Sequence, residues 1–303
     1  MSRTKKLLIP AAILAGIAAG YFYAPVRLLA IVAAGRSPVC PLENALQAAV
    51  NQRDQVRYKD QILAASRLME KDPAGYHLWQ TPRGSWWIPE GDDWVLPFNL
   101  AEQERRIYGT GERGVRSGDI VLDCGANVGV YTRLALDEGA RTVVAIEPAP
   151  ENLEAFRRNF RAEIAAGRVI VVPKGVWNRD EWLMLSIDAH NTAADSFVMN
   201  QKPENRTVRV PLTTIDKLVT ELKLDRVDFI KMDIEGAEQR ALIGAQDTLA
   251  RFHPRLALSA YHRPDDPQRI PELVRKAWSG YTMECGPCAE GRGLIRPDVL
   301  YFR

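Results

Sequence analysis

The sequence carries almost no charge imbalance. Its 303 residues include 40 Lys and Arg against 38 Asp and Glu, which leaves a formal net charge of +2. A protein that holds nucleic acid through bulk charge needs a clear basic excess, so this composition argues against a nucleic-acid partner. Internal repeats and low-complexity segments are absent as well. An apolar content of 46% and a charged content of 26% are ordinary for a globular protein with one large domain or two small ones.

Cysteine is scarce, with only four in the chain: Cys40, Cys124, Cys285 and Cys288. Cys124 falls in a predicted buried strand, and Cys40 is isolated. The last two form a single C-x-x-C pair, whereas a zinc site of the common kind needs a second pair. Glycine and proline separate them, which is typical of a turn. We therefore expect free thiols, with a redox or metal role as the minor alternative.

The most informative motif lies in the middle of the chain. An apolar run at 120–122 predicts a buried strand and leads into D-C-G-A-N-V-G at 123–129. The glycines allow a tight turn, and 130–138 has helical character, so free N–H groups at the helix start would face a ligand. A second apolar strand at 142–146 ends in Glu147. A carboxylate there, about 20 residues beyond the glycines, is placed to bind both hydroxyls of a ribose.

The motif favours one nucleoside cofactor over another. In the nicotinamide pattern G-x-G-x-x-G, the second glycine is here Asn127, and Gly129 comes one residue early. Asp123 precedes the first glycine, where it would repel a pyrophosphate and attract the ammonium group of S-adenosylmethionine. We therefore predict S-adenosylmethionine rather than NAD, with purely structural glycines as the alternative. The expected cofactor-binding residues are Asp123, Gly125, Asn127, Gly129, Glu147 and Pro148.

From about Gly118 to its end, the chain resembles the FkbM family of S-adenosylmethionine-dependent O-methyltransferases. The resemblance rests on an ordered set of stretches: 118–129, Glu147-Pro148, 210–216, 228–238 and Tyr261-His262. It implies an α/β fold with the Rossmann-like seven-stranded sheet of class I methyltransferases, closed by an antiparallel hairpin. It also implies methylation of a hydroxyl, on acceptors that range over sugars, polyketides and other metabolites.

Three parts are expected: an apolar membrane segment at 1–36, a helical and tryptophan-rich extension at 37–115, and a methyltransferase domain at 116–303. Alternating strands and helices in the last part predict a parallel sheet. Its expected strands lie near 120–124, 142–147, 168–173, 227–232 and 255–261, and its helices near 128–138, 151–163, 213–223, 237–250 and 267–277. Extra strands are expected at 182–187 and 208–212, and the polar loop between them lies where an acceptor lid would sit.

The extension at 37–115 has two predicted halves. Residues 41–71 have helical spacing. Residues 75–97 read as short strands and carry four tryptophans: Trp79, Trp86, Trp87 and Trp94. We favour a small satellite core for these rings, with an aromatic platform for a sugar or for a membrane interface as the alternative. A short helix is expected at 99–108, from which Glu102 or Tyr108 would cover the cofactor.

The N-terminus carries the one long uncharged run. Leu7 to Ala24 has no charged residue, follows three basic residues, and is about long enough to cross a bilayer. We predict an uncleaved membrane anchor, with a signal peptide as the rival and an in-plane insertion as a third reading. The basic residues favour an external catalytic domain. Because S-adenosylmethionine is a cytoplasmic metabolite, we nevertheless expect that domain in the cytoplasm.

Catalysis is expected at the ends of two later strands. If the strand near 227–232 continues far enough, Lys231, Asp233 and Glu235 would share one of its faces. His262 ends the next strand, where ligands of an open sheet bind. Asp233 or His262 would act as the base and Lys231 would stabilise the alkoxide. The alternatives are structural roles for all of them, or a divalent metal, which we consider the weaker reading. His190, in the variable loop, would touch substrate.

Together these features predict a membrane-associated O-methyltransferase that acts on a hydroxyl of a sugar, glycan or lipid-linked metabolite. The membrane-linked acceptor follows from the anchor alone. A non-catalytic scaffold that retains the fold is the main alternative, and a nicotinamide enzyme conflicts with Asp123 and Asn127.

Overall fold

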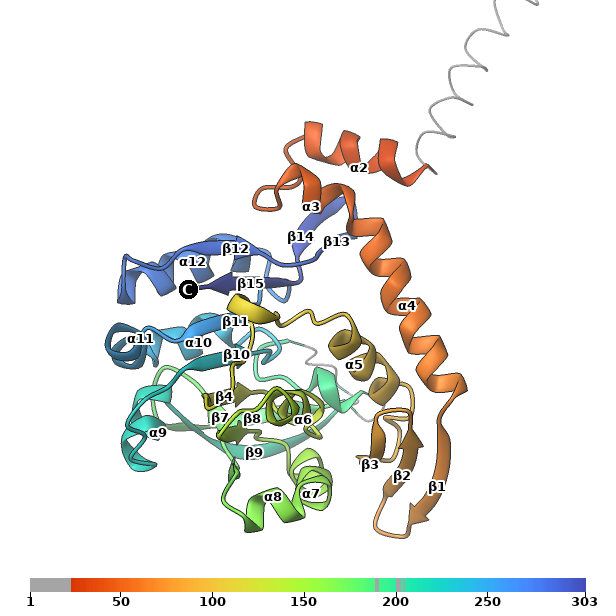
Figure 1. The fold of residues 1–303 in the computed structure, drawn as a ribbon, viewed down its shortest axis with the longest axis vertical. Helices are drawn as coiled ribbons and strands as arrows, with labels where there is room; N and C mark the ends of the chain where they lie inside the picture. The colour runs from red at the N-terminus through yellow and green to blue at the C-terminus, as the bar shows by residue number, and fades with distance from the viewer. Residues whose placement is uncertain (1–22, 189–190, 200–202, 204) are drawn as a thin grey trace, which may run out of the picture.

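The computed structural model describes residues 23–188, 191–199, 203 and 205–303 (Figure 1). Its centre is a seven-stranded sheet in the order β12-β15-β11-β10-β4-β5-β6. The strands are β4 (Ile120–Cys124), β5 (Thr142–Ile146), β6 (Val169–Val172), β10 (Phe229–Met232), β11 (Arg255–Ser259), β12 (Met283–Cys285) and β15 (Val299–Phe302). β11, β10, β4, β5 and β6 are mutually parallel, and β15 pairs antiparallel with both of its neighbours. The predicted sheet and its closing antiparallel hairpin are confirmed.

Helices cover both faces of this sheet, which explains why its strands are apolar at successive positions. On β4, the side chain of Val121 packs with the first helical layer and that of Leu122 with the second. The first layer contains α6 (Val130–Asp137) and α7 (Pro150–Asn159), and α8 (Arg161–Ala165) follows it. The second layer is formed by α9 (Ile215–Glu221), α10 (Glu238–Ile243), α11 (Gln246–Phe252) and α12 (Asp266–Ala277). The predicted helices are therefore present, two of them as broken pairs.

A smaller three-stranded sheet interrupts the alternation between β6 and α9. It has the order β7-β9-β8 and is built from β7 (Gly175–Val176), β8 (Glu181–Ile187) and β9 (Arg206–Thr213). The two extra strands expected here are confirmed. Among the described residues between these two strands is one 3-10 turn, η2 (Thr192–Ala194). His190, the residue expected to touch substrate, lies outside the described residues.

The extension at 37–115 is part helix and part sheet. It begins with α3 (Leu42–Leu46) and α4 (Ala48–Ala64), continues as a three-stranded antiparallel sheet of β1 (Arg67–Asp72), β2 (Tyr76–Thr81) and β3 (Gly84–Pro89), and ends with α5 (Val95–Glu104) and η1 (Gly111–Arg113). Figure 1 shows α4 running from the hairpin β13–β14 to this sheet, alongside α5.

Two predicted boundaries in the extension are wrong. The long helix ends at Ala64, where the hydroxyl of Ser66 donates a hydrogen bond to the carbonyl of Ile62, and residues 67–71 belong to β1. Pairing with β2 supplies hydrogen bonds that helical spacing does not reveal. The short helix α5 also begins four residues before the predicted Asn99 and ends at Glu104.

The tryptophans divide between core and cavity. Trp86 is buried and contacts Phe160 edge-on, as expected for a satellite core. The indole N–H of Trp79 donates to the carboxylate of Asp93. Trp94 is 48% exposed and lines the cavity described below.

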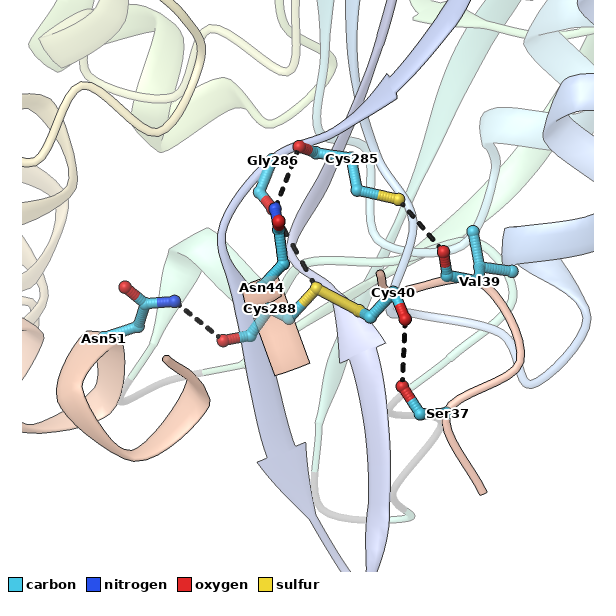
Figure 2. The surroundings of a disulfide bond; sticks show 8 residues. All are labelled: Ser37, Val39, Cys40, Asn44, Asn51, Cys285, Gly286 and Cys288. Carbon is cyan, nitrogen blue, oxygen red and sulfur yellow. Dashed lines mark hydrogen bonds between the residues drawn. A yellow bond between two sulfur atoms is a disulfide. The ribbon is translucent and has the colours of Figure 1, made fainter. Parts of the chain in front are cut away.

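A disulfide joins the N-terminal part of the described chain to its C-terminal part, as Figure 2 shows. Cys40 pairs with Cys288, the first residue of β13 (Cys288–Gly291), which forms a hairpin with β14 (Leu294–Pro297). The amide of Asn44 donates to the carbonyls of Cys285 and Gly286, and the amide of Asn51 donates to the carbonyl of Cys288. These contacts attach α3 and α4 to the C-terminal hairpin.

The expectation of free thiols is therefore wrong for Cys40 and Cys288 and correct for the other two cysteines. Cys124 and Cys285 are free, and burial raises the pKa of both thiols. The C-x-x-C spacing of Cys285 and Cys288 gave no sign of a disulfide to Cys40. Cys288 nevertheless bonds to Cys40, which lies 248 residues away in the sequence. Only the tertiary fold brings these two sulfurs together.

The sequence predicts a membrane anchor at residues 7–24. No helix among the described residues is long and apolar enough to cross a membrane, and residues 7–22 of the predicted anchor lie outside them. The shorter apolar stretch that follows the predicted anchor, at 28–34, falls almost entirely in α2 (Ala24–Ala33). Its Leu28 and Ile31 are buried in one cluster with Ala45, Cys288 and Ile295. That stretch is therefore part of the folded domain.

We expect Cys40→Ser to destabilise the protein, because the disulfide limits the freedom of the unfolded chain. The expected loss is about 2–5 kcal/mol of unfolding free energy, measured by denaturant titration without reductant. Cys285→Ser, which removes a free thiol beside the same hairpin, is the matched control and should lose much less. Dithiothreitol should lower the wild type to the level of the variant. Equal stability of Cys40→Ser and the wild type under oxidising conditions would contradict this account.

Candidate functional site

The loop after β4 requires glycine at two positions. Gly125 has a φ of +79°, and a Cβ there would lie 1.9 Å from the carbonyl oxygen of Asp233. Gly129 has a φ of +100°, and a Cβ there would lie 2.1 Å from the ring of Phe160. Asn127, between them, has a φ of +49°, a conformation that Asn tolerates better than most residues. The loop therefore presses closely against the end of β10 and leads directly into α6.

Glu147, at the end of β5, holds this loop from the other side. One carboxylate oxygen accepts a hydrogen bond from the backbone N–H of Asn127 at 2.9 Å, and the other accepts from the N–H of Ala149 at 2.9 Å. A carboxylate has about four lone-pair sites, so these two backbone hydrogen bonds do not use its full capacity as an acceptor. Burial raises the pKa of Glu147, against the opposing effect of these hydrogen bonds. Its predicted contact with a ribose stays a prediction.

Asp123, the first residue of the motif, does not lie where its predicted contact with the cofactor requires. Asp123 is completely buried and does not line the cavity beside the loop. It accepts a hydrogen bond from the hydroxyl of Thr132 at 2.7 Å and lies 3.3 Å from the ammonium of Lys231. The predicted contact of Asp123 with the ammonium group of the cofactor is therefore not what the structure presents. Its carboxylate faces the buried ammonium of Lys231 instead.

Lys231 also differs from its predicted role. Its ammonium donates to the backbone carbonyl of Gly125 at 2.8 Å and to that of Cys124 at 3.4 Å, besides contacting Asp123. An ammonium has three donors, and these three contacts use them. Lys231 thus binds the glycine loop to the end of β10, rather than offering a free donor to an alkoxide.

A single cavity of about 380 Å³ connects the loop with the later strand ends. On the loop side it is lined by Gly125, Asn127, Glu147 and Pro148, and on the opposite side by Lys231, Asp233, Glu235 and Tyr261. α5 and the residue before it form another wall, with Trp94, Phe98, Asn99, Glu102 and Gln103. The segment Asn191–Asp195, together with Phe197, closes the remaining side. Most of the predicted site residues therefore face one space, and Gly129 and His262 lie behind its walls.

The predicted strand face beyond β10 does not form. β10 ends at Met232, and the backbone N–H of Asp233 still donates to the carbonyl of Cys124. Glu235 has a φ of +52° and Gly236 a φ of +92°, so the chain turns sharply before α10. The alternation expected for Lys231, Asp233 and Glu235 is therefore wrong, but the turn still brings both carboxylates to the cavity wall.

His262 lies at the centre of an acidic cluster. Its Nδ1 is 2.8 Å from Oε1 of Glu238, and its Nε2 is 3.4 Å from Glu235 and 3.6 Å from Asp233. Burial lowers the pKa of this imidazole, but the carboxylates of Glu238 and Glu235 hold it well above its usual value. The cluster thus joins the ends of β10 and β11, as predicted for His262, Asp233 and Glu235.

Glu238 is a functional candidate that the sequence reasoning did not single out. It is completely buried, and its Oε1 also accepts the backbone N–H of Ile234 at 3.0 Å. The available signal was its position in the first turn of a helix, directly after the Asp233–Gly236 segment. An acidic residue there is also explained by the helix dipole, so its contact with His262 was not visible in the sequence.

Asp233 contacts both Tyr108, from the segment after α5, and His262, after the end of β11. The hydroxyl of Tyr108 donates to its Oδ2 at 2.7 Å. Burial opposes ionisation, but the charges of Lys231 and His262 hold the pKa of Asp233 below its usual value. Glu102 is affected in the opposite way, because burial and the charge of Asp233 raise its pKa well above the usual range. Tyr108 and Glu102 both line the cavity, where the sequence placed them as a cover.

The segment Asn191–Asp195, which lines the cavity, is anchored by a residue that the sequence did not point to. Asp92, in the extension, accepts hydrogen bonds from the backbone N–H of Thr192, at 3.0 Å, and from its hydroxyl. The same hydroxyl contacts the amide oxygen of Asn152 at 2.7 Å. Burial raises the pKa of Asp92 to about 6. The extension therefore shapes the site by holding the Asn191–Asp195 segment in place.

This sheet order, with a glycine loop after the central strand and a carboxylate after its neighbour, is that of the Rossmann-like methyltransferase class. Residues 123–281, more than half of the chain, match the family model described as the methyltransferase FkbM domain. The chain therefore belongs to the FkbM methyltransferase family, as the motifs predicted.

Similar proteins cover only parts of the chain. It is 28% identical over 160 residues to the 31-O-demethyl-FK506 methyltransferase FkbM of Streptomyces tacrolimicus, covering 44% of this chain and 62% of that protein. It is 29% identical over 137 residues to a ribosomal protein L11 methyltransferase of Burkholderia orbicola, covering 40% and 44%. The chain thus spans less than two thirds of either relative. A solved methyltransferase FkbM from Methylobacillus flagellatus KT shares 18% identity, with a TM-score of 0.48 over 85% of this chain and 60% of that chain.

We expect Glu147→Ala to weaken binding of S-adenosylhomocysteine at least about tenfold, because a hydrogen bond to a charged group contributes about 1.5–3 kcal/mol. Calorimetric titration would measure the affinity, and circular dichroism would check the fold. Glu154→Ala, on the neighbouring helix α7 and outside the cavity lining, is the control. An unchanged affinity in the folded Glu147 variant would contradict the ribose assignment.

Proposed function

We propose that the protein is an S-adenosylmethionine-dependent O-methyltransferase that acts on a hydroxyl of a sugar, glycan or lipid-linked metabolite. The observation that carries this proposal is the shared cavity. It places Glu147 and the glycine loop on one side and Asp233 and Glu235 on the other. Membership of the FkbM methyltransferase family supports the reaction class.

The residues present fit the cofactor. Gly125 leaves no room for a side chain between the loop and the end of β10, so a ligand would meet backbone there. Asn127, Glu147 and Pro148 face the same part of the cavity, and Glu147 would hold the ribose. S-adenosylmethionine supplies an electrophilic methyl group on a positively charged sulfur. The protein must orient the acceptor, exclude water and remove the hydroxyl proton.

Among the candidates for the base, the electrostatics favour Asp233. Its lowered pKa keeps the carboxylate ionised at neutral pH, while the raised pKa of His262 favours the imidazolium. The acceptor hydroxyl would donate its proton to Asp233 as its oxygen attacks the methyl carbon. Tyr108 fixes the carboxylate through Oδ2, which leaves Oδ1 as the receiving atom. Lys231 is assigned to hold the loop, because its donors are already used.

The cavity walls support a hydroxylated acceptor with both apolar and polar faces. Trp94, Phe98 and Tyr261 present aromatic rings, and Asn99 and Glu102 present polar groups beside them. Aromatic rings bind the apolar faces of rings such as sugars, while neighbouring polar groups bind their hydroxyls. This lining is compatible with a sugar, and the FK506-related substrate named for the Streptomyces relative suggests that larger acceptors are accommodated within the family.

We also propose that residues 7–24 attach the protein to a membrane, on the strength of their uncharged sequence. The need for a cytoplasmic cofactor supports a cytoplasmic catalytic domain. The Cys40–Cys288 disulfide argues for the opposite side, because disulfides persist mainly in oxidising compartments. Labelling of Cys285 in intact and in permeabilised cells would report which side is correct.

The first experiment is a calorimetric titration of the full chain with S-adenosylhomocysteine and with NAD. Binding of the first alone supports the proposal. It would be followed by transfer of a labelled methyl group to membrane glycans and glycolipids. A folded protein that binds neither cofactor would overturn the proposal and favour a non-catalytic scaffold.

With an accepted substrate, Asp233→Asn should lower kcat by about 10²–10⁴-fold, the usual contribution of a general base. Its affinity for S-adenosylhomocysteine should change little, because the assigned cofactor contacts lie across the cavity. The control is Asp225→Asn, since the Asp225 side chain is 78% exposed and distant from the cavity lining. A wild-type kcat in Asp233→Asn would exclude Asp233 as the base.

A further inference from the structure

The acidic cluster contains buried polar atoms that the protein itself does not satisfy. In the described part of the chain, Oδ1 of Asp233, Oε2 of Glu238 and Nε2 of His262 have no hydrogen-bond partner. His262 is 8% exposed and Glu238 is fully buried. An unsatisfied buried polar group costs about 1–3 kcal/mol. Nε2 of His262 still faces carboxylate oxygens of Glu235 at 3.4 Å and of Asp233 at 3.6 Å, so the group forms ion pairs but keeps lone pairs that it could offer to a ligand.

The spacing of these atoms fits a cation. Candidate ligand atoms of Asp233, Glu238 and His262 all lie within 4.8 Å of one another. Nε2 of His262 is 3.4 Å from Oε1 of Glu235 and 3.6 Å from Oδ1 of Asp233. Two ligand atoms that each lie about 2.1 Å from one metal ion, at tetrahedral to octahedral angles, are about 3.0–3.4 Å apart. The separations of Nε2 from the two carboxylate oxygens of Glu235 and Asp233 are therefore close to those that a shared ion requires.

The imidazole is also oriented as a metal ligand usually is. A ligating histidine typically donates its other ring N–H to a carboxylate, which fixes the ring and its tautomer. Here Glu238 accepts at Nδ1, and its own carboxylate is held by the backbone N–H of Ile234. Nε2 is therefore the nitrogen that points toward Asp233 and Glu235.

The net negative charge of the cluster also favours a bound cation. Three carboxylates, those of Asp233, Glu235 and Glu238, surround one imidazole. The nearest lysine on the same strand, Lys231, is bound to Asp123 and to the loop carbonyls. A divalent cation would replace the proton on Nε2, because a ligating imidazole is neutral, and its two charges would balance more of the negative charge than that proton does.

We propose that Asp233, Glu235 and His262 bind a divalent metal ion at the edge of the cavity, with Glu238 orienting the imidazole. Two carboxylate oxygens and one imidazole nitrogen suit a first-row ion such as Mn²⁺. Asp233 and Glu235 line the cavity, so the ion would face the acceptor. This inference rests on the proposed function for its purpose: an acceptor hydroxyl that coordinates the ion would have a lowered pKa and release its proton to solvent more readily, and Asp233 would then act as a ligand in place of the base.

The test is a titration of the full chain with Mn²⁺, followed by the loss of the electron paramagnetic resonance signal of the free ion. We expect one bound Mn²⁺ per chain. His262→Gln should weaken binding at least tenfold, and Glu238→Gln about 10–100-fold, as is usual for a residue that orients a ligand. The matched control is His253→Gln, because His253 is exposed and stacks on Trp278 away from the cavity.

The outcomes separate this inference from the proposed function. A wild-type protein that binds S-adenosylhomocysteine but takes up no Mn²⁺, Mg²⁺ or Zn²⁺ overturns the metal site and leaves the metal-free base in place. Stoichiometric Mn²⁺ binding that persists unchanged in His262→Gln also overturns it, since the ion would then lie elsewhere. Because the wild-type titration alone decides the first point, a variant that fails to fold does not prevent the test.

Discussion

The site depends on the close approach of two neighbouring strand ends. β4 and β10 lie side by side in the parallel sheet, and Gly125 leaves its loop against the carbonyl of Asp233 with no room for a Cβ. The ammonium of Lys231 reinforces this contact by binding two loop carbonyls and the buried carboxylate of Asp123. A buried ammonium and carboxylate are costly to separate. The same contact therefore sets the shape of the cofactor loop and the position of the acidic cluster.

Elements outside the sheet complete the cavity rather than create it. Asp92 of the extension anchors Thr192 of the cavity wall, and Tyr108 reaches from the segment after α5 to Asp233. The disulfide and the amides of Asn44 and Asn51 attach α3 and α4 to the C-terminal hairpin. Because α4 packs against α5, one side of the cavity is held in place by a chain of contacts that reaches both ends of the described chain.

Local sequence patterns predicted the strands of the central sheet well, but they predicted the acidic cluster around His262 only in part. Runs such as 120–122 and 142–146 are apolar at every position because both faces of the sheet are covered, so they stand out in the sequence. The strand predicted near 227–232 ends where expected, at Met232, but the further extension on which a shared face for Glu235 depended does not occur, since a backbone turn at Glu235 and Gly236 has no periodic signal. His262 and Asp233 were still correctly placed together, because carboxyl ends of adjacent parallel strands meet at one edge.

Local periodicity and short motifs were enough to predict the fold class, the family, the glycine loop and the residues at the strand ends. The tertiary structure decided the Cys40–Cys288 pairing, the burial of Asp123 against Lys231, the contact of Glu238 with His262 and the anchoring of Thr192 by Asp92. Each of these joins residues from separate elements. A hydrogen bond, ion pair or disulfide of this kind depends on distances in space, and spacing along the chain carries no record of them.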